Sequence, residues 1–240
     1  MLSSTSRIAH RQIPSSLSRI EFSLKSQTHF IFGANTDVGK SVITAGLIRA
    51  SGETAHYIKP LQCGGSDQRF VTKHAPNVAS ATTLFEWESY SSPHVASRNE
   101  GLPVSDEQVL SALENCLADL PSPSRNWIET AGGVLSPSSA SPDNCSAYHA
   151  LDDRLSWGWL PQADLYQPLL AIGSVVLVGD GRLGGISATL SSLESLLVRG
   201  YYVSGIVLLE TGFSNHEAIQ EYASRLVVTH SSSLKQMRRQ

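Results

Sequence analysis

The residues whose types and spacing point most clearly to a chemical function lie at 33–41, in the stretch Gly-Ala-Asn-Thr-Asp-Val-Gly-Lys-Ser. An apolar run precedes this stretch, and apolar residues at helical spacing follow it from Val42. A strand, a glycine loop and a helix in this order wrap a phosphate chain with backbone N–H groups. Lys40 adds a point charge there, and the Ser41 hydroxyl can hold Mg²⁺. We call residues 33–41 the phosphate loop and expect it to bind ATP or GTP.

The spacing of this loop departs from the usual pattern, in which four residues separate the first glycine from Gly-Lys. Ala34 stands at that first position, and Gly33 lies one residue earlier. The alternative interpretation is a glycine turn beside a surface lysine. The Gly-Lys-Ser core and its flanking strand and helix favour nucleotide binding.

Two further strand ends carry charged residues. Lys59 ends an apolar strand at 55–61, where Pro60 is expected to terminate it, and Asp67 follows in the next loop. Ligands bind beyond the carboxyl ends of strands in an open α/β sheet, so both side chains are expected near the phosphates. The alternative for Lys59 is an ordinary solvated lysine.

Glu129 ends a short strand at 126–129, directly ahead of the glycine pair Gly132 and Gly133. In phosphate-loop enzymes an acid on a neighbouring strand end binds Mg²⁺ directly or through water. Ser41, Asp67 and Glu129 together supply the hard oxygen donors that Mg²⁺ prefers. The alternative for Glu129 is a capping or turn acid.

A second glycine loop follows the apolar strand at 174–179 and opens another helix with Gly184, Gly185, Ile186 and Ser187. The N–H groups of such a helix start can bind an anion. A plain helix start explains the same residues, so both interpretations stay open here.

The elements that must position these residues alternate between strand and helix, and the strands are short and apolar. This alternation predicts an α/β fold, with a mostly parallel sheet covered by helices on both faces. Residues 81–90 are left without a type, and 136–142 are expected to form a flexible loop. The stretch 141–161 is interpreted as a lid, an insertion or a product of alternative splicing. Strands are expected at 29–32, 55–61, 126–129, 174–179 and 203–209, and helices at 42–48, 68–74, 105–120, 188–197 and 217–226.

The bulk composition fits one domain over residues 28–228 of the 240. The apolar fraction of 41% is enough for a core, and the net charge of −3 gives no sign of a nucleic-acid partner. No run of eighteen apolar residues is present, so no membrane span is expected. Three cysteines at wide spacings indicate neither a disulfide framework nor a zinc site.

The two ends differ from this domain. Residues 1–27 are rich in Ser and Arg and contain one acid, which is typical of an organelle transit peptide. A mitochondrial destination is favoured over a plastid, and the alternative is a disordered leader on a cytoplasmic protein. Residues 229–240 are expected to form a disordered tail.

Taken together, these motifs resemble the dethiobiotin synthetase family, of the eukaryotic type that is often fused to a diaminopelargonic acid aminotransferase. The resemblance implies a P-loop NTPase-like fold. It also implies ATP- and Mg²⁺-dependent carboxylation and ring closure of 7,8-diaminononanoate with CO₂, a step of biotin biosynthesis. It covers residues 29–225 and rests on the stretches 33–41, 57–64, 66–67, 92–97, 128–133 and 178–187.

The same resemblance implies roles for single residues. Lys40 would hold the β- and γ-phosphates, with Thr36 and Asp37 beside the substrate and nucleotide. Lys59 would stabilise the carbamate and the transferred phosphoryl group, and Cys63 stands where many members have a serine that faces the substrate. The other implied residues are Val38, Gly39, Gly132 and Gly133 for the nucleotide, Ser41, Asp67 and Glu129 for Mg²⁺, and Gly184, Gly185, Ile186 and Ser187 for the substrate carboxylate.

The substrate carboxylate site is completed by the other subunit in this family, so a homodimer is implied. Two other functions remain as alternatives. One is a phosphate-loop switch ATPase that acts on protein partners. The other is an inactive, truncated fragment of a synthetase.

Overall fold

The computed structural model describes residues 27–144, 157–209 and 211–225. The predicted tail at 229–240 lies outside these residues, as does the predicted leader except for its last residue. That residue, Gln27, is the first residue of the first strand. The elements in chain order are β1 Gln27–Gly33, α1 Lys40–Ser51, β2 Ala55–Cys63, α2 Asp67–His74, β3 Val78–Trp87, α3 Pro93–Glu100, α4 Asp106–Ala118, β4 Arg125–Glu129, α5 Gln162–Leu165, η2 Gln167–Ile172, β5 Gly173–Gly179, α6 Gly185–Val198 and β6 Val203–Leu208, followed by helical residues 215–225.

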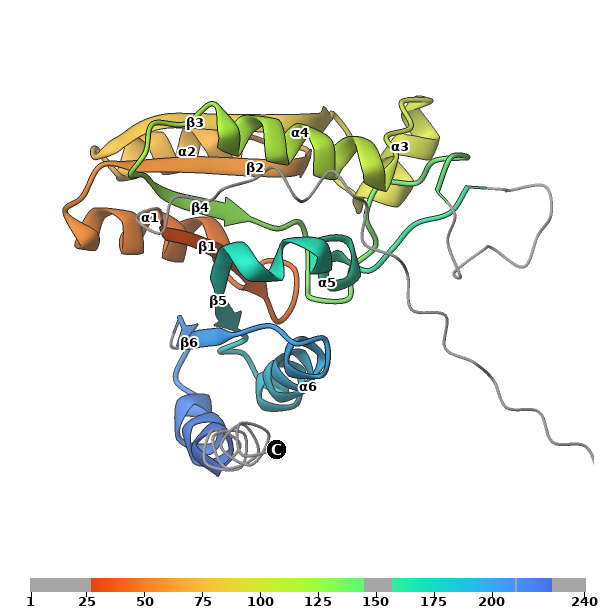
Figure 1. The fold of residues 1–240 in the computed structure, drawn as a ribbon. Helices are drawn as coiled ribbons and strands as arrows, with labels where there is room; N and C mark the ends of the chain where they lie inside the picture. The colour runs from red at the N-terminus through yellow and green to blue at the C-terminus, as the bar shows by residue number, and fades with distance from the viewer. Residues whose placement is uncertain (1–26, 145–156, 210, 226–240) are drawn as a thin grey trace, which may run out of the picture.

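The strands form one sheet in the order β3-β2-β4-β1-β5-β6, and each pairing between the described strands is parallel (Figure 1). The chain moves from β1 to one side of the sheet, through β2 and β3, and later crosses to the other side through β5 and β6. A change of direction of this kind opens a crevice at the carboxyl ends of the central strands. The expected α/β fold of the P-loop NTPase type is confirmed.

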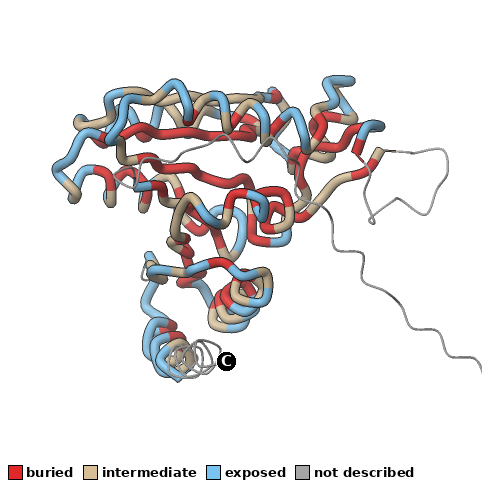
Figure 2. Tube along the Cα trace, viewed as in Figure 1, coloured by how far each residue is buried: buried red, intermediate tan, exposed pale blue. Residues whose placement is uncertain are grey.

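Helices cover both faces of the sheet because successive strand residues point to opposite sides. On β1, Ile31 packs in a cluster with residues of α1 and α2, whereas Phe30 and Phe32 pack in a cluster with residues of α3, α4, α5 and α6. The four central strands are accordingly buried along most of their length, the edge strands β3 and β6 are mostly half-buried, and the outer sides of the helices are exposed (Figure 2).

The helix expected at 105–120 is present as α4. The Ser105 hydroxyl accepts a hydrogen bond from the Gln108 N–H, and the Gln108 side chain accepts one from the Ser105 N–H, which completes a capping box. Such a cap stabilises a helix by about 1 kcal/mol. Val109, Leu113 and Leu117 are buried against the sheet, and Cys116 packs beside them as expected.

The expectation that Pro60 ends the second strand is wrong, because β2 continues to Cys63. The ladder between β2 and β4 ends at Ile58, whereas the ladder between β2 and β3 continues to Cys63. Pro60 has no N–H, and it lies past the end of the β4 ladder, where a donor toward β4 is no longer needed.

The untyped residues at 81–90 lie mostly in β3, an edge strand that pairs only with β2 among the described strands. Most of its residues are half-buried, so the sequence shows neither the strict alternation of a one-sided strand nor the apolar run of a central one.

The expectation of a flexible loop at 136–142 is also wrong. Ser138, Ser139, Ala140 and Ser141 are buried, and a bridge joins Ser141 to Gly158. The Ser138 hydroxyl donates to Asp106, and the Ser139 hydroxyl accepts from the Val104 N–H. These serines therefore satisfy buried backbone and side-chain groups instead of facing water.

Within the stretch 141–161, residues 145–156 lie outside the described part of the chain, so its interpretation as a lid or insertion stays a prediction. Among the described helices, none is both long enough and apolar enough to cross a bilayer.

Candidate functional site

The phosphate loop joins β1 to α1 at the carboxyl edge of the sheet. Gly39 precedes α1 with a left-handed φ of 88°, a conformation that favours glycine. The structure also explains the unusual position of Gly33. A β-carbon at residue 33 would stand 3.1 Å from both the Cδ and Nζ atoms of Lys40, and 2.8 Å from the Asn35 carbonyl oxygen. A glycine one residue earlier than usual therefore leaves room for the Lys40 side chain to fold back over the loop.

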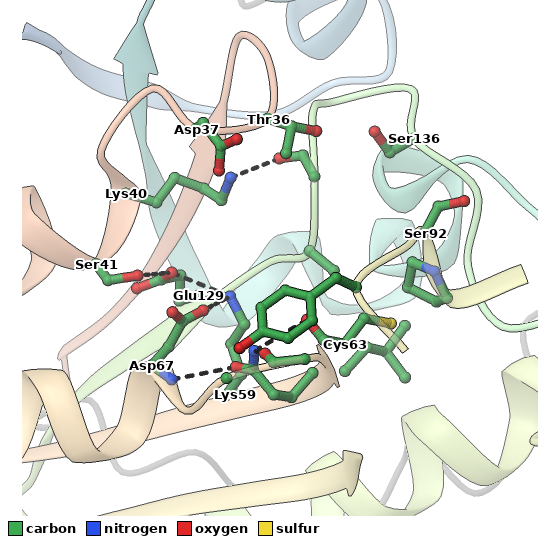
Figure 3. Close-up of a pocket in the computed structure, with 18 of the residues that line it drawn as sticks. Thr36, Asp37, Lys40, Ser41, Lys59, Cys63, Asp67, Ser92, Glu129 and Ser136 are labelled. Atoms are coloured by element: carbon green, nitrogen blue, oxygen red, sulfur yellow. Dashed lines mark hydrogen bonds and ion pairs between the residues drawn. The ribbon is translucent and has the colours of Figure 1, made fainter. Parts of the chain in front are cut away.

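A cavity of about 780 Å³ opens beside this loop. Most of the sequence-predicted nucleotide and metal residues line it and converge in Figure 3. Val38 instead packs in the core cluster beneath the loop, and Gly133 lies behind the wall, where its N–H donates to the Ser136 hydroxyl. The predicted residues that line the cavity are Thr36, Asp37, Gly39, Lys40, Ser41, Lys59, Cys63, Asp67, Glu129 and Gly132.

Lys40 reaches across the cavity, and its Nζ atom donates to the Gly132 carbonyl oxygen at 2.8 Å (Figure 3). Its side chain is buried. Burial, followed by repulsion from the Lys59 ammonium, lowers the pKa of Lys40 to about 8. A neighbouring anion such as a phosphate would favour the charged form and raise this pKa.

Lys59 lies between two carboxylates from different elements. Its Nζ atom is 2.7 Å from Asp67 Oδ2 and 3.0 Å from Glu129 Oε1. Burial alone would lower the pKa of Lys59, but the attraction of Glu129 and then Asp67 outweighs it and raises the pKa. Burial likewise acts to raise the pKa of Asp67, and the charge and hydrogen bond of Lys59 outweigh it and lower that pKa. Lys59 and Asp67 are therefore both charged at neutral pH.

The fully buried Glu129 carboxylate is surrounded by donors. Its Oε1 atom accepts from the Ser41 hydroxyl at 2.8 Å as well as from Lys59. Its Oε2 atom lies 3.0 Å from the Thr44 hydroxyl and 3.2 Å from the Tyr57 hydroxyl. Burial, followed by the Glu129 charge, raises the pKa of Tyr57 well above its ordinary value, so the phenol keeps its proton.

Sequence reasoning missed Thr44 and Tyr57. The available signal was spacing: Thr44 lies one helical turn after Ser41, and Tyr57 lies two residues before Lys59 on the same side of β2.

The end of the cavity away from the phosphate loop has a different lining. Gly64 and Gly65 follow β2 with φ values of 59° and 63°. A β-carbon on Gly64 would stand 2.6 Å from the Tyr90 ring, so this exposed ring lies directly on the glycine backbone. Tyr90, missed by sequence reasoning, and Ser92, the first residue of the stretch 92–97, line the cavity here beside Cys63. Burial, with the Glu100 carboxylate as the next cause, raises the pKa of Cys63 to about 12.

The second glycine loop does not join this cavity. Gly184, Ile186 and Ser187 line a separate cavity of about 710 Å³, and Gly185 is buried against the Asp180 carbonyl oxygen. Hydrogen bonds nevertheless join this part of the chain to the phosphate loop. The Arg182 side chain, ion-paired with Asp180 at 2.8 Å, donates to the Thr36 carbonyl oxygen at 3.4 Å, and the Ser192 hydroxyl of α6 donates to the Ala34 carbonyl oxygen at 3.3 Å. Within one chain, the predicted carboxylate site is therefore apart from Lys59 and Cys63.

Comparisons with known proteins give a domain type and a family of relatives. Residues 27–144 match the family described as an AAA domain. A bifunctional dethiobiotin synthetase/7,8-diamino-pelargonic acid aminotransferase, mitochondrial, from Oryza sativa subsp. japonica is 33% identical over 86% of this chain and 30% of its own length. A bifunctional dethiobiotin synthetase/adenosylmethionine-8-amino-7-oxononanoate aminotransferase from Emericella nidulans is 35% identical over 82% of this chain and 24% of its own length.

A shorter relative is matched over most of its own length. The ATP-dependent dethiobiotin synthetase BioD of Haloferax mediterranei is 30% identical over 74% of this chain and 69% of its own length. The chain thus spans less than a third of the two bifunctional relatives and about two thirds of the single-function one.

Proposed function

Because the chain belongs to the dethiobiotin synthetase family, we propose that it catalyses the ATP-dependent carboxylation and ring closure of 7,8-diaminononanoate to dethiobiotin. One observation carries the proposal. Two lysines and a set of hard oxygen donors, from β2, β4, α1 and the start of α2, line a single cavity beside the phosphate loop. This set suits a reaction that transfers a phosphoryl group between two oxygen atoms.

The proposed reaction has three steps. Carbon dioxide adds to one amine of the substrate, which loses a proton and becomes a carbamate. A carbamate oxygen then attacks the γ-phosphorus of ATP, and the bond from that phosphorus to the bridging oxygen breaks to release ADP. The second amine attacks the carbonyl carbon of this mixed anhydride, phosphate leaves, the amine gives up its proton, and the ureido ring closes.

The residues around the cavity suit charge stabilisation and positioning more than covalent chemistry. The phosphate loop, from Thr36 and Asp37 to Gly39, would hold the triphosphate, with Lys40 at the β- and γ-phosphates. Lys59 would lie between the carbamate and the transferred phosphoryl group. The neutral Cys63 thiol, near the Tyr90 ring, would face the diamine.

Magnesium fits the donor set at this site. Ser41, Asp67 and Glu129 offer one hydroxyl and two carboxylates, all of them hard oxygen ligands. The two carboxylates already share one cation, the Lys59 ammonium, at 2.7 and 3.0 Å. We assign these three residues as the ones that would hold Mg²⁺ or its water ligands, and the ion when bound would neutralise charge on the phosphates.

The substrate carboxylate is assigned to Gly184, Gly185, Ile186 and Ser187 at the start of α6. Since these residues lie apart from Lys59 within one chain, the proposal includes a homodimer in which one subunit supplies this helix start to the other. Leu183, 83% exposed beside it, would lie in the interface. Leu183→Glu is expected to give a monomer in sedimentation velocity. Val198→Glu, at a similarly exposed site at the far end of α6, serves as the matched control.

The proposed location is the mitochondrion. The Ser- and Arg-rich leader supports it, and the rice relative carries the word mitochondrial in its name. The alternative is the cytoplasm.

The decisive experiment incubates the protein with diaminononanoate, bicarbonate and Mg·ATP, and searches for the cyclic urea by mass spectrometry. The expected result is a product whose formation needs all three, with stoichiometric phosphate release. Lys40→Ala should lower turnover about 10²–10³-fold, because it removes one charge at the γ-phosphate. Phosphate release without the diamine would instead indicate a switch ATPase, and the absence of any release would indicate an inactive fragment.

A further inference from the structure

We propose that Tyr57 is a positioning residue for the divalent-metal site, and that its hydroxyl fixes the orientation of the Glu129 carboxylate. This inference deepens the proposed function and rests on its assignment of Glu129 to the metal.

The two carboxylate oxygens of Glu129 contact different groups. Oε1 faces the groups of the cavity wall, Ser41 and Lys59, at 2.8 and 3.0 Å. Oε2 faces the hydroxyls of Thr44 and Tyr57 at 3.0 and 3.2 Å, within the buried layer beneath α1. A carboxylate held at one oxygen presents the other in a fixed direction, as groups behind metal ligands do in metal sites.

The two hydroxyls at Oε2 differ as donors. The Thr44 hydroxyl also lies 2.8 Å from the Lys40 carbonyl oxygen, and its single proton can serve only one of these acceptors. The Tyr57 hydroxyl donates its proton to Glu129 Oε2. Tyr57 is therefore the donor whose proton is not shared between Oε2 and a second acceptor.

The presence of a phenol at this place has a physical reason. Tyr57 has no exposed surface and packs among apolar residues of α1, α2 and the sheet, where phenylalanine would fill nearly the same volume. A buried hydroxyl is costly unless it is hydrogen-bonded, and here the bond is made to a carboxylate of the site.

The chain offers a matched control in Tyr166. It is equally buried, and its hydroxyl has no hydrogen-bond partner among the described residues. Tyr57→Phe and Tyr166→Phe therefore remove the same atom from equally buried positions, but only the first removal changes the surroundings of Glu129.

The test measures Mn²⁺ binding to the full chain by electron paramagnetic resonance, with a non-hydrolysable ATP analogue present. Tyr57→Phe is expected to weaken Mn²⁺ binding about tenfold, in the range seen when groups behind metal ligands are removed. Tyr166→Phe should leave it unchanged, and both variants should bind the analogue without metal as the wild type does.

Wild-type Mn²⁺ affinity in Tyr57→Phe, or equal losses in both variants, would overturn the inference. Failure of the wild type itself to bind Mn²⁺ with the analogue would count against the proposed metal site instead, so the two failures are distinguishable. If Tyr57→Phe does not fold, Thr44→Val carries the test, because it leaves Tyr57 as the single hydroxyl at Oε2. Mn²⁺ binding is then expected to stay within about threefold of the wild type, and a loss of tenfold or more would refute the primacy of Tyr57.

Discussion

At the level of single residues, the Lys59 ammonium does two jobs in this structure. It neutralises two carboxylates, one of them fully buried, and it is the group proposed to face the carbamate. Removal of one partner from a buried ion pair leaves an uncompensated charge, which costs more than the pair itself contributes.

Lys59→Ala is therefore expected to lower the free energy of unfolding by about 3 kcal/mol in the absence of Mg²⁺. Millimolar Mg²⁺ should restore part of this loss, because the ion supplies a cation to the same two carboxylates. Urea unfolding with and without Mg²⁺ measures both effects, with the wild type as the control. If the free energy of unfolding of the variant does not change with Mg²⁺, the assignment of Asp67 and Glu129 to the metal is contradicted.

Cys63 gives a prediction on pH. With a pKa of about 12 its thiol is protonated at neutral pH, and the thiolate is the reactive form. Alkylation of Cys63 by iodoacetamide should be slower than that of an unperturbed cysteine by roughly a hundredfold or more at neutral pH. The rate should still rise above about pH 10, where an ordinary thiol has levelled off. Peptide mapping by mass spectrometry follows it, with Cys63→Ser to identify the labelled peptide.

Sequence reasoning found the charged residues of the site because each stands at a recognisable place. Lys40 follows a glycine loop, Glu129 ends β4, and Lys59 was expected at the end of a strand, although it lies in the middle of β2, just past the end of the β4 ladder. Tyr57 and Thr44 lie inside regular elements and look like ordinary core residues. Their contact with Glu129 depends on how α1 lies on the sheet, which no local pattern in the sequence specifies.

At the level of elements, the turn after β2 carries the wall of the cavity opposite the phosphate loop. Gly64→Ala is expected to destabilise the protein by about 1–2 kcal/mol, because its φ of 59° strains any larger residue and the new methyl group would meet the Tyr90 ring. Gly46→Ala, inside α1 with nothing within 4 Å, should stabilise by about 0.5–1 kcal/mol. Urea unfolding of both variants compares them, and a destabilised Gly46→Ala would refute this account of the glycines.

The order of elements could be predicted from the sequence. The two errors arose where a general rule about a residue type was overridden by contacts with a neighbouring segment. Pro60 does not stop β2 because the β4 ladder has already ended at Ile58. The serines at 138–141 looked like a solvent loop by composition, yet their hydroxyls satisfy groups of α4 and its neighbours. Both outcomes depend on contacts between segments that are distant along the chain.

At the level of the whole molecule, the described fold begins at its centre: β1 starts at Gln27 and lies in the middle of the sheet. Deletion of residues 1–26 is expected to leave thermal unfolding and diamine-dependent turnover unchanged, and to abolish import into isolated mitochondria. Import that persists after the deletion would remove the transit-peptide interpretation.

The separation of the two cavities is a property that the sequence did not reveal. The phosphate loop and the α6 loop look alike as glycine-rich helix starts. In the sheet, however, the Lys59 and Glu129 strands lie on one side of β1 and the α6 loop follows β5 on the other. Strand order is decided by the packing of the whole chain, so only the folded molecule shows which loops meet.

Leu209 connects the phosphate loop to the edge of the sheet. It directly follows β6, the outermost strand on its side of the sheet, and its Cδ1 atom stands 2.4 Å from where a β-carbon on Gly39 would be. The phosphate loop thus packs against the residue that directly follows β6. An ATP analogue that immobilises the loop should therefore slow amide hydrogen–deuterium exchange across Val203–Leu208, because local opening of this edge strand becomes less favourable.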